Sequence, residues 1–167
     1  MAKKKASKPI SAGLLMFERE DEVRVLLAHP GGPYFAKKDK GAWSIPKGLV
    51  HAGEDYLETA QREFVEETGY ELKPATEFIS LESATLKSGK RVFAWAFEGT
   101  WEAGRIPDSN TFTIEWPPRS GKMQSFPEID RAEMFTIGDA RLKINERQLP
   151  FLERLLLSLR TQSGSTD

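Results

Sequence analysis

The chain has 167 residues, 39% hydrophobic and 29% charged, which predicts one globular domain and excludes disordered and fibrous classes. The sequence contains no cysteine, so disulfides, thiolate catalysis and cysteine-based metal sites are excluded. The net charge of -1 hides a basic N-terminus: four of the 24 basic residues precede residue 9, which leaves 20 against 25 acidic residues.

The ends of the chain are expected to lie outside the domain. We expect a disordered basic tail over residues 1–8, a single domain over 9–160, and a polar C-terminal tail over 161–167. No apolar run resembles a signal peptide or approaches the ~18 residues of a membrane span, so we expect a cytoplasmic protein without membrane partners. The acidic body argues against a nucleic-acid-binding face, although the tail could attract polyanions weakly.

The first half of the chain begins with two predicted strands, "SAGLLMFE" and "VRVLLAHP", on either side of a charged turn. A Gly/Pro-rich loop follows, and then "WSIPKG", where Pro46 disfavours a helical conformation at Ile45. A helix is predicted from near Asp55 to Gly69, because glycine is a common residue just after the last helical turn.

The second half begins with a predicted hairpin over residues 77–101, which turns at "KSGK". Residues 103–127 are expected to be irregular, and "EMFTI" is expected to form a short strand. Leu149, Leu152, Leu156 and Leu159 recur at helical spacing and predict a C-terminal helix that packs on the core. Strands dominate and two helices accompany them, so we expect an α+β or a layered α/β/α domain.

The predicted helix over residues 55–69 has an unusual acidic face. At 100° per residue, Glu63, Glu66 and Glu67 fall on one face, next to an apolar face with Leu57 and Phe64. Like charges at this spacing repel one another, and partly buried carboxylates are costly unless they are neutralised. Either the face is solvated, or a cation binds there.

The residue types favour a hard divalent cation at this acidic face. Carboxylate oxygens suit Mg²⁺, with Mn²⁺ as a substitute, and Mg²⁺ typically shares its remaining positions with water and phosphate oxygens. His29 and His51 are the only histidines, which argues against a histidine-built zinc site. The three glutamates alone do not distinguish a metal–phosphate site from a solvated face.

A longer pattern extends this acidic face. Gly48 is followed after five residues by Glu54, and after seven more by "REFVEETGY", residues 62–70. This spacing resembles the Nudix box at every defined position, and on it the chain is identified as a Nudix hydrolase. "WSIPKG" and "FPEIDRAEMFTI" also look like the family, which extends a looser resemblance over roughly residues 10–160.

The resemblance implies a fold, an activity and residue roles. The implied fold is an α/β/α sandwich with a mixed central β-sheet and a C-terminal helix, and the implied reaction is hydrolysis of a nucleoside diphosphate linked to another moiety. Among the metal ligands it implies are Glu66, Glu67 and the Gly48 carbonyl oxygen, and Glu63 would be a ligand, the general base or both. The remaining roles fall to Arg62, which would orient the helix by pairing with Glu54, and to Glu128, which lies where relatives often supply another carboxylate.

Several residues are candidates for binding the substrate. We call residues 48–54, which on this resemblance contribute to the metal site, the metal loop. Lys47, held between Pro46 and this loop, is expected to contact a phosphate oxygen, with an ordinary exposed loop lysine as the alternative. Tyr34 and Trp43 could stack on a base, and packing is the alternative for each. Arg119 and Lys122 could bind a distal phosphate or could form a solvated turn.

Three functions remain open from the sequence. "PKG" before the box and the chain length look like dinucleoside polyphosphate hydrolases, which split diadenosine tetraphosphate into ATP and AMP; the absence of tyrosine from residues 81–93 departs from several of them. Hydrolysis of nucleoside triphosphates or of RNA 5′-pyrophosphates is the alternative. A nucleotide-sensing module without catalysis is the third, and the intact glutamates argue against it.

Overall fold

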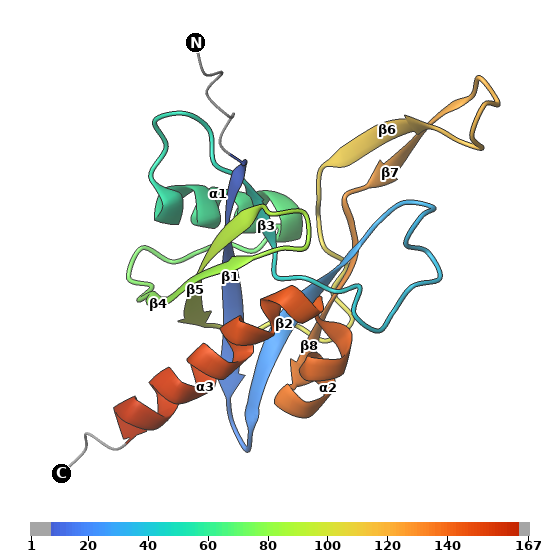
Figure 1. Cartoon of the computed structure of the whole chain (residues 1–167). Coiled ribbons are helices and arrows are strands. Elements are labelled where there is room, and N and C mark those ends of the chain that lie inside the picture. The colour runs from blue at the N-terminus through green and yellow to red at the C-terminus, as the bar shows by residue number, and fades with distance from the viewer. Residues whose placement is uncertain (1–7, 164–167) are drawn as a thin grey trace.

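A mixed β-sheet forms the centre of the computed structural model, which describes residues 8–163 (Figure 1). β1 (Ile10–Arg19) lies in the middle, parallel to β5 (Arg91–Glu98) and antiparallel to β2 (Val23–Pro30). The strands run in the order β4 (Ile79–Thr85), β5, β1, β2 and β8 (Ile129–Thr136), and β3 (Lys47–Leu49) also pairs with β1. The hairpin predicted over residues 77–101 is therefore the β4–β5 pair.

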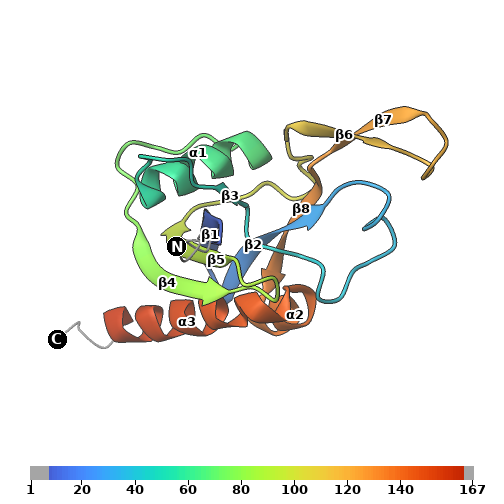
Figure 2. The same ribbon diagram turned by 45° about the horizontal axis from the view of Figure 1, so that its top comes forward.

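Helices cover both faces of this sheet (Figure 2). α1 (Tyr56–Thr68) packs on one face, and α2 (Ile137–Lys143), a 3₁₀ turn (Glu146–Gln148) and α3 (Leu149–Ser163) lie on the other. β1 is buried on both sides, because Leu14 and Met16 face α1 while Leu15 and Phe17 face α3. The predicted α/β/α sandwich with a mixed sheet and a C-terminal helix is confirmed.

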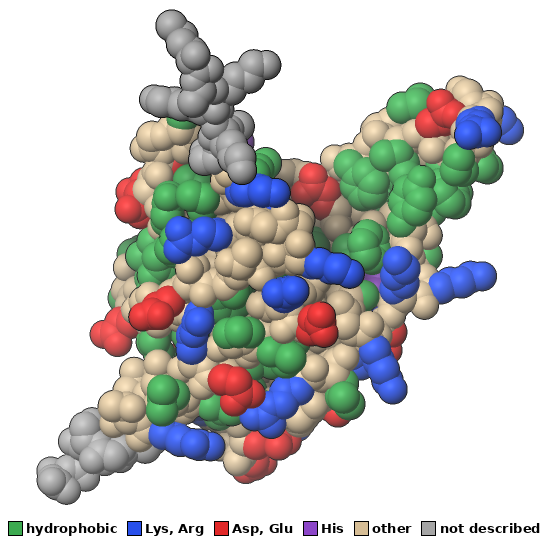
Figure 3. Space-filling model, in the orientation of Figure 1, with side chains coloured by type: hydrophobic (Ala, Val, Ile, Leu, Met, Phe, Trp, Pro, Cys, Tyr) green, Lys and Arg blue, Asp and Glu red, His purple; other side chains and the backbone are tan. Residues whose placement is uncertain are grey.

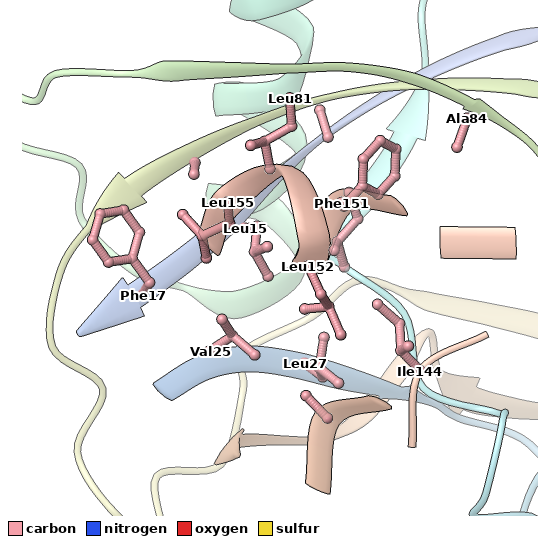
Figure 4. Packing of buried hydrophobic residues seen from close by; sticks show 14 of the residues in the cluster. Leu15, Phe17, Val25, Leu27, Leu81, Ala84, Ile144, Phe151, Leu152 and Leu155 are labelled. Atoms are coloured by element: carbon pink, nitrogen blue, oxygen red, sulfur yellow. The ribbon is translucent and has the colours of Figure 1, made fainter. Parts of the chain in front are cut away.

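The packing beneath α3 depends on large aliphatic and aromatic side chains (Figure 4). Phe151, Leu152 and Leu155 are fully buried against Leu15 and Leu27 of the sheet. The predicted leucine stripe is correct for Leu149, Leu152 and Leu159, whereas the fully buried Leu155 is part of this core and Leu156 is only half-buried. The helix extends to Ser163, three residues beyond the predicted domain boundary.

An arm projects from the body beside the sheet (Figures 1 and 2). It consists of β6 (Thr111–Glu115) and β7 (Met123–Pro127), which pair antiparallel in a separate two-stranded sheet. The expectation of an irregular segment over residues 103–127 is therefore wrong for these two strands. Polar and apolar residues alternate over only five positions in β6 and do not alternate in β7. "EMFTI" is likewise the end of a longer strand, β8, and the seven-residue helix α2 was not predicted.

Only part of the two predicted tails lies within the described residues. Lys8 donates a hydrogen bond from Nζ to the Ser88 carbonyl oxygen at 3.1 Å, and the rest of the predicted basic tail lies outside the described residues. The last four residues of the predicted C-terminal tail also lie outside them. Within residues 8–163, no helix has the length and apolar character needed to cross a bilayer.

Candidate active site

α1 begins and ends where its sequence predicts. The Asp55 side chain caps the N-terminus by accepting a hydrogen bond from the Glu58 N–H at 3.1 Å. Gly69 adopts the left-handed conformation, with φ 74°, and its N–H donates to the Val65 carbonyl oxygen at 2.8 Å. The two caps fix where the helix begins and ends, and the spacing of the glutamates within it decides which of them share a face.

Arg62 forms ion pairs with two carboxylates of this helix and with one that precedes it. Its Nη1 lies 2.9 Å from Glu63 Oε1 and 3.3 Å from Glu66 Oε2. Its Nη2 lies 3.1 Å from Glu54 Oε1, so the Arg62–Glu54 pairing that the resemblance implied is present. The Glu54 pKa is lowered by a hydrogen bond from the His51 N–H and by the Arg62 charge. The metal loop and the helix are thereby tied through one guanidinium group.

Glu67 is the most buried member of the acidic face. It is 8% exposed, and its Oε2 accepts a hydrogen bond from the Lys47 N–H at 3.0 Å. Burial raises the pKa of Glu67 to about 8, against the opposing charge of Lys47 and with the neighbouring charges of Glu63 and Glu128. Burial raises the pKa of Glu63 as well, although Arg62 opposes that shift. At neutral pH and without a cation, the Glu67 carboxyl group therefore retains its proton, because a negative charge is costly at this buried position.

Gly48 lies directly against the Glu63 carboxyl group. A Cβ at this position would overlap that carboxyl group, so a side chain is excluded by contact with Glu63. β3 carries Gly48 past the helix because it pairs with β1, where Gly48 is opposite Ala12. A similar close approach occurs at Gly13, where a Cβ would lie 2.5 Å from the Pro46 carbonyl oxygen. Two glycines thus let the metal loop pass between β1 and α1.

Lys47 and Glu128 place further charges at the acidic face. Burial lowers the pKa of the Lys47 ammonium, as does the charge of Lys90, while Glu67 and Glu63 raise it. Glu128 follows β7 directly and is exposed, and its charge contributes to the raised pKa values of both Glu63 and Glu67. The proximity of Glu128 is compatible with the additional carboxylate that the sequence suggested.

The donor set is suitable for a hard divalent cation. Three carboxylates and the Gly48 carbonyl oxygen are hard oxygen donors, and a cation would offset the cost of ionised Glu67 in its buried position. Within residues 8–163, no three acidic or histidine side chains converge tightly enough to enclose a metal by themselves. This is compatible with Mg²⁺, which commonly binds one or two carboxylates and completes its shell with water and phosphate.

Two supporting side chains had no recognisable signal in the sequence. Gln148, buried in the 3₁₀ turn, accepts a hydrogen bond from the Ile45 N–H at 3.0 Å and donates one to Ser44 Oγ at 2.9 Å. His29, buried in β2, lies 2.7 Å from Asp130 Oδ1 and donates from Nε2 to the Lys38 carbonyl oxygen at 2.6 Å. Gln148 anchors the approach to the metal loop, and His29 anchors the loop over residues 31–42.

The substrate candidates divide into buried and exposed residues. Trp43 is 1% exposed, with its ring against His29 and Phe135, so it packs the core and presents no free face to a base. Trp43 therefore has a packing role. The sequence pattern alone does not distinguish a tryptophan that packs in the core from one that stacks on a base. Tyr34 is 60% exposed and contacts Trp116. Arg119 and Lys122 are exposed in the turn of the arm, away from the acidic face (Figure 1).

The chain matches known proteins in sequence. The NUDIX domain family model matches residues 7–155. Over 111 residues, the chain is 32% identical to a putative nudix hydrolase 1 from Caenorhabditis elegans; the match covers 64% of this chain and 28% of that relative's length.

Solved structures share the fold at low sequence identity. A C. elegans Ap4A hydrolase in a binary complex superposes with a TM-score of 0.62 at 21% identity, covering 90% of this chain and 98% of that one. The NUDIX domain of Shewanella oneidensis NrtR complexed with ADP ribose gives a TM-score of 0.62 at 15% identity, covering 93% and 90%. The family match, the intact box and the Arg62-centred carboxylates place this chain in the Nudix family.

Proposed function

We propose that the protein is a Mg²⁺-dependent nucleotide pyrophosphohydrolase that cleaves dinucleoside polyphosphates such as diadenosine tetraphosphate, with Mn²⁺ as a substitute metal. The observation that carries the proposal is that Glu63 and Glu66 both pair with Arg62, with Gly48 against Glu63. The buried Glu67, from the next position of the same helix, accepts a hydrogen bond from the Lys47 N–H beside Gly48. Carboxylates held together in partly buried positions suit a cation that also binds phosphate oxygens.

The residues have distinct roles in the proposed reaction. Glu66, Glu67 and the Gly48 carbonyl oxygen would hold the metal, with Glu128 as an additional carboxylate. When bound, the divalent cation supplies Lewis-acid polarisation of the phosphate oxygens and lowers the pKa of water. Glu63 would accept the proton of the attacking water, and burial, which raises its pKa, strengthens it as a base.

Arg62 and Lys47 support this reaction by position and charge. Arg62 orients Glu63 through their 2.9 Å contact and holds Glu54 at the other end of the metal loop. Lys47 places a cation between Pro46 and Gly48, where it can balance charge on a phosphate of the substrate. Water attack at phosphorus then breaks the phosphoanhydride bond, and the two phosphate-terminated products leave separately.

The choice of dinucleoside polyphosphates rests on residues outside the metal site. "PKG" overlaps the start of the box, and exposed aromatic and basic side chains lie outside the box, at Tyr34, Arg119 and Lys122. A substrate with two bases and a long phosphate chain would use such a spread of contacts. The likeness to the C. elegans Ap4A hydrolase supports this choice at the level of the fold.

The test is a substrate panel with Mg²⁺, read by chromatography of the products. The panel contains diadenosine tetraphosphate, nucleoside triphosphates, a nucleotide sugar, ADP-ribose and RNA with a 5′-triphosphate. We expect ATP plus AMP from diadenosine tetraphosphate at the highest kcat/KM. A preference for triphosphates or for RNA ends would reject this substrate class while leaving the pyrophosphohydrolase chemistry in place, and no turnover of any member would favour the sensing module.

Deleting residues 1–8 distinguishes the RNA alternative. If RNA were the substrate, loss of the four lysines would weaken RNA turnover and spare small nucleotides, because phosphate contacts dominate nucleic-acid affinity. On the leading proposal, the deletion leaves the turnover of diadenosine tetraphosphate unchanged.

A further inference from the structure

The β6–β7 arm has one polar face and one apolar face. Antiparallel pairing places Phe112 opposite Phe126 and Ile114 opposite Gln124, and strand alternation puts Trp116 on the same side. Phe112, Ile114, Trp116 and Phe126 are half-buried, and together they form what we name the aromatic face of the arm. The opposite side presents the exposed side chains of Thr113, Glu115, Met123 and Ser125.

The loop after β2 packs against the aromatic face. At Gly32, which has φ +96°, a Cβ would lie 2.6 Å from the Phe112 ring, and at Gly31 a Cβ would overlap the Pro127 carbonyl oxygen. Tyr34 then contacts Trp116 edge-to-face, with ring centroids 5.2 Å apart and planes at 77°. An isolated two-stranded ribbon is marginally stable in water, so this contact supports the arm. Tyr34 nevertheless remains 60% exposed.

The arm begins and ends beside the proposed metal site. Glu128, whose charge acts on Glu63 and Glu67, follows Pro127 of β7 directly. Its N–H donates to the Asn110 carbonyl oxygen at 2.8 Å, and its own carbonyl accepts from the Gly31 N–H at 2.9 Å. The space-filling view shows hydrophobic side chains along the arm next to a hollow that separates the arm from the body (Figure 3).

Exposed basic side chains lie on the same two segments of the chain as Tyr34 and the aromatic face. Lys37, Lys38 and Lys40 are exposed on the loop that carries Tyr34, and Arg119 and Lys122 are exposed at the turn of the arm. Lys38 Nζ lies 5.2 Å from the centroid of the Phe35 ring. Aromatic rings bordered by cations suit a planar group that carries phosphates, because stacking binds the plane and the cations bind the charge.

We propose that Tyr34 and the aromatic face bind a nucleobase of the substrate, so that its phosphates reach the acidic face past Glu128. The inference rests on the proposed function, and it assigns base recognition to the β6–β7 arm rather than to the helix. Tyr34 supplies an exposed ring, and Trp116 holds that ring in place. Stacking is worth about 1–3 kcal/mol per base, which corresponds to a roughly 5- to 150-fold change in affinity.

Binding measured without turnover tests the inference separately from the proposed function. AMP and ribose 5-phosphate carry the same phosphate, and only AMP carries a base. In calorimetric titrations of the full chain with Mg²⁺, we expect AMP to bind about tenfold more tightly than ribose 5-phosphate, by the lower half of that stacking range. Tyr34→Ala and Trp116→Ala should remove this difference, whereas Tyr34→Phe should keep it.

Met123→Ala is the matched control, because Met123 lies on the opposite face of the same arm and is 63% exposed. It should bind both ligands as the unaltered protein does. Equal binding of AMP and ribose 5-phosphate by the unaltered protein would overturn the inference. So would an unchanged AMP preference in Tyr34→Ala, a change that requires no refolding of the ribbon.

Kinetics and association state give the remaining outcomes. With diadenosine tetraphosphate, Tyr34→Ala should raise KM about tenfold with kcat unchanged within twofold, as expected when a binding contact outside the reacting atoms is lost. If hydrolysis proceeds and KM does not move, the proposed function stands and the base site is rejected. Sedimentation experiments could instead show a dimer that Trp116→Ala dissociates while AMP binding stays intact. That result would assign the aromatic face to contact with a second copy of the chain, and it would also reject the base site.

Discussion

The acidic face of α1 and the aromatic face of the arm are built in opposite ways. The first lies within one continuous stretch, residues 47–67. The ends of its helix are fixed by two local caps, Asp55 and Gly69. The second joins residues 31–34 to residues 112–126 and depends on two glycines that allow close approach. Residues proposed to perform the chemistry are here encoded locally, whereas those proposed to select the substrate are brought together only by folding.

Substitution of a metal-ligand candidate should give the largest effect and should affect only the acidic face. Glu67→Gln keeps a carbonyl oxygen for the Lys47 N–H but removes the charge that a cation would bind. We expect kcat/KM to fall by about three orders of magnitude, within the range typical of lost charge stabilisation at a reacting site. The fold should remain intact by circular dichroism. Glu66→Gln should behave alike, and unchanged Mg²⁺-dependent turnover in either variant would reject the metal assignment.

Gly48→Ala should disturb the same acidic face through a steric clash. The added methyl group would overlap the Glu63 carboxyl group, so the loop or the helix must shift. We expect activity to fall about 10- to 100-fold and stability to fall by about 1–3 kcal/mol, as for other overpacked sites. Urea denaturation and steady-state kinetics measure the two effects.

Gly138→Ala is the control for Gly48→Ala. Gly138 lies in α2, and a Cβ there would meet no atom within 4 Å. Since alanine favours helix, this variant should match the unaltered protein or exceed its stability by up to about 1 kcal/mol. Equal losses from both variants would contradict a specific role for the Gly48–Glu63 contact.

Gly32→Ala should affect the arm and spare the chemistry. Its φ of +96° and the nearby Phe112 ring both oppose a side chain, so the loop should detach from the arm. We expect KM for diadenosine tetraphosphate to rise about five- to tenfold, with kcat and its dependence on Mg²⁺ retained. A loss of kcat comparable to that of Gly48→Ala would mean that the two regions are not separable.

The smallest effect should be a pH dependence of stability from Glu67. Its folded pKa of about 8 exceeds its ordinary value of 4.5, so the folded state retains a proton that the unfolded state has lost. Without metal, stability should therefore fall as pH rises from 4.5 to 8. The raised Glu63 pKa acts in the same direction, and the lowered Glu54 pKa in the opposite one.

Thermal melts in a chelator at several pH values measure this dependence. Glu67→Gln should flatten the fall, and Mg²⁺ should restore Tm most strongly near pH 8, where the cation meets an ionised site. A Tm that rises with pH over this range in the unaltered protein would contradict the burial of Glu67.

The same contrast explains which features the sequence predicts. The caps, the spacing of Glu63, Glu66 and Glu67, and the apolar runs of β1 and β2 are visible in short windows, and the structure has all of them. Trp43 could not be assigned, because an aromatic residue before a loop looks the same whether it stacks or packs. Gln148 and His29 each act through hydrogen bonds to residues outside their own element, and no local sequence pattern indicates these contacts.

The hydrogen bond between Asn110 and Glu128 has a consequence for how the molecule can change. The two ends of the arm meet there, so the 17 residues between them form an insert that enters and leaves the body at one point. Because those ends are already joined, a shorter or different hairpin could replace the arm with a small entropic cost of closure. Descendants of this chain could therefore acquire new substrates by exchanging the β6–β7 arm alone, while α1 and its acidic face are inherited unaltered.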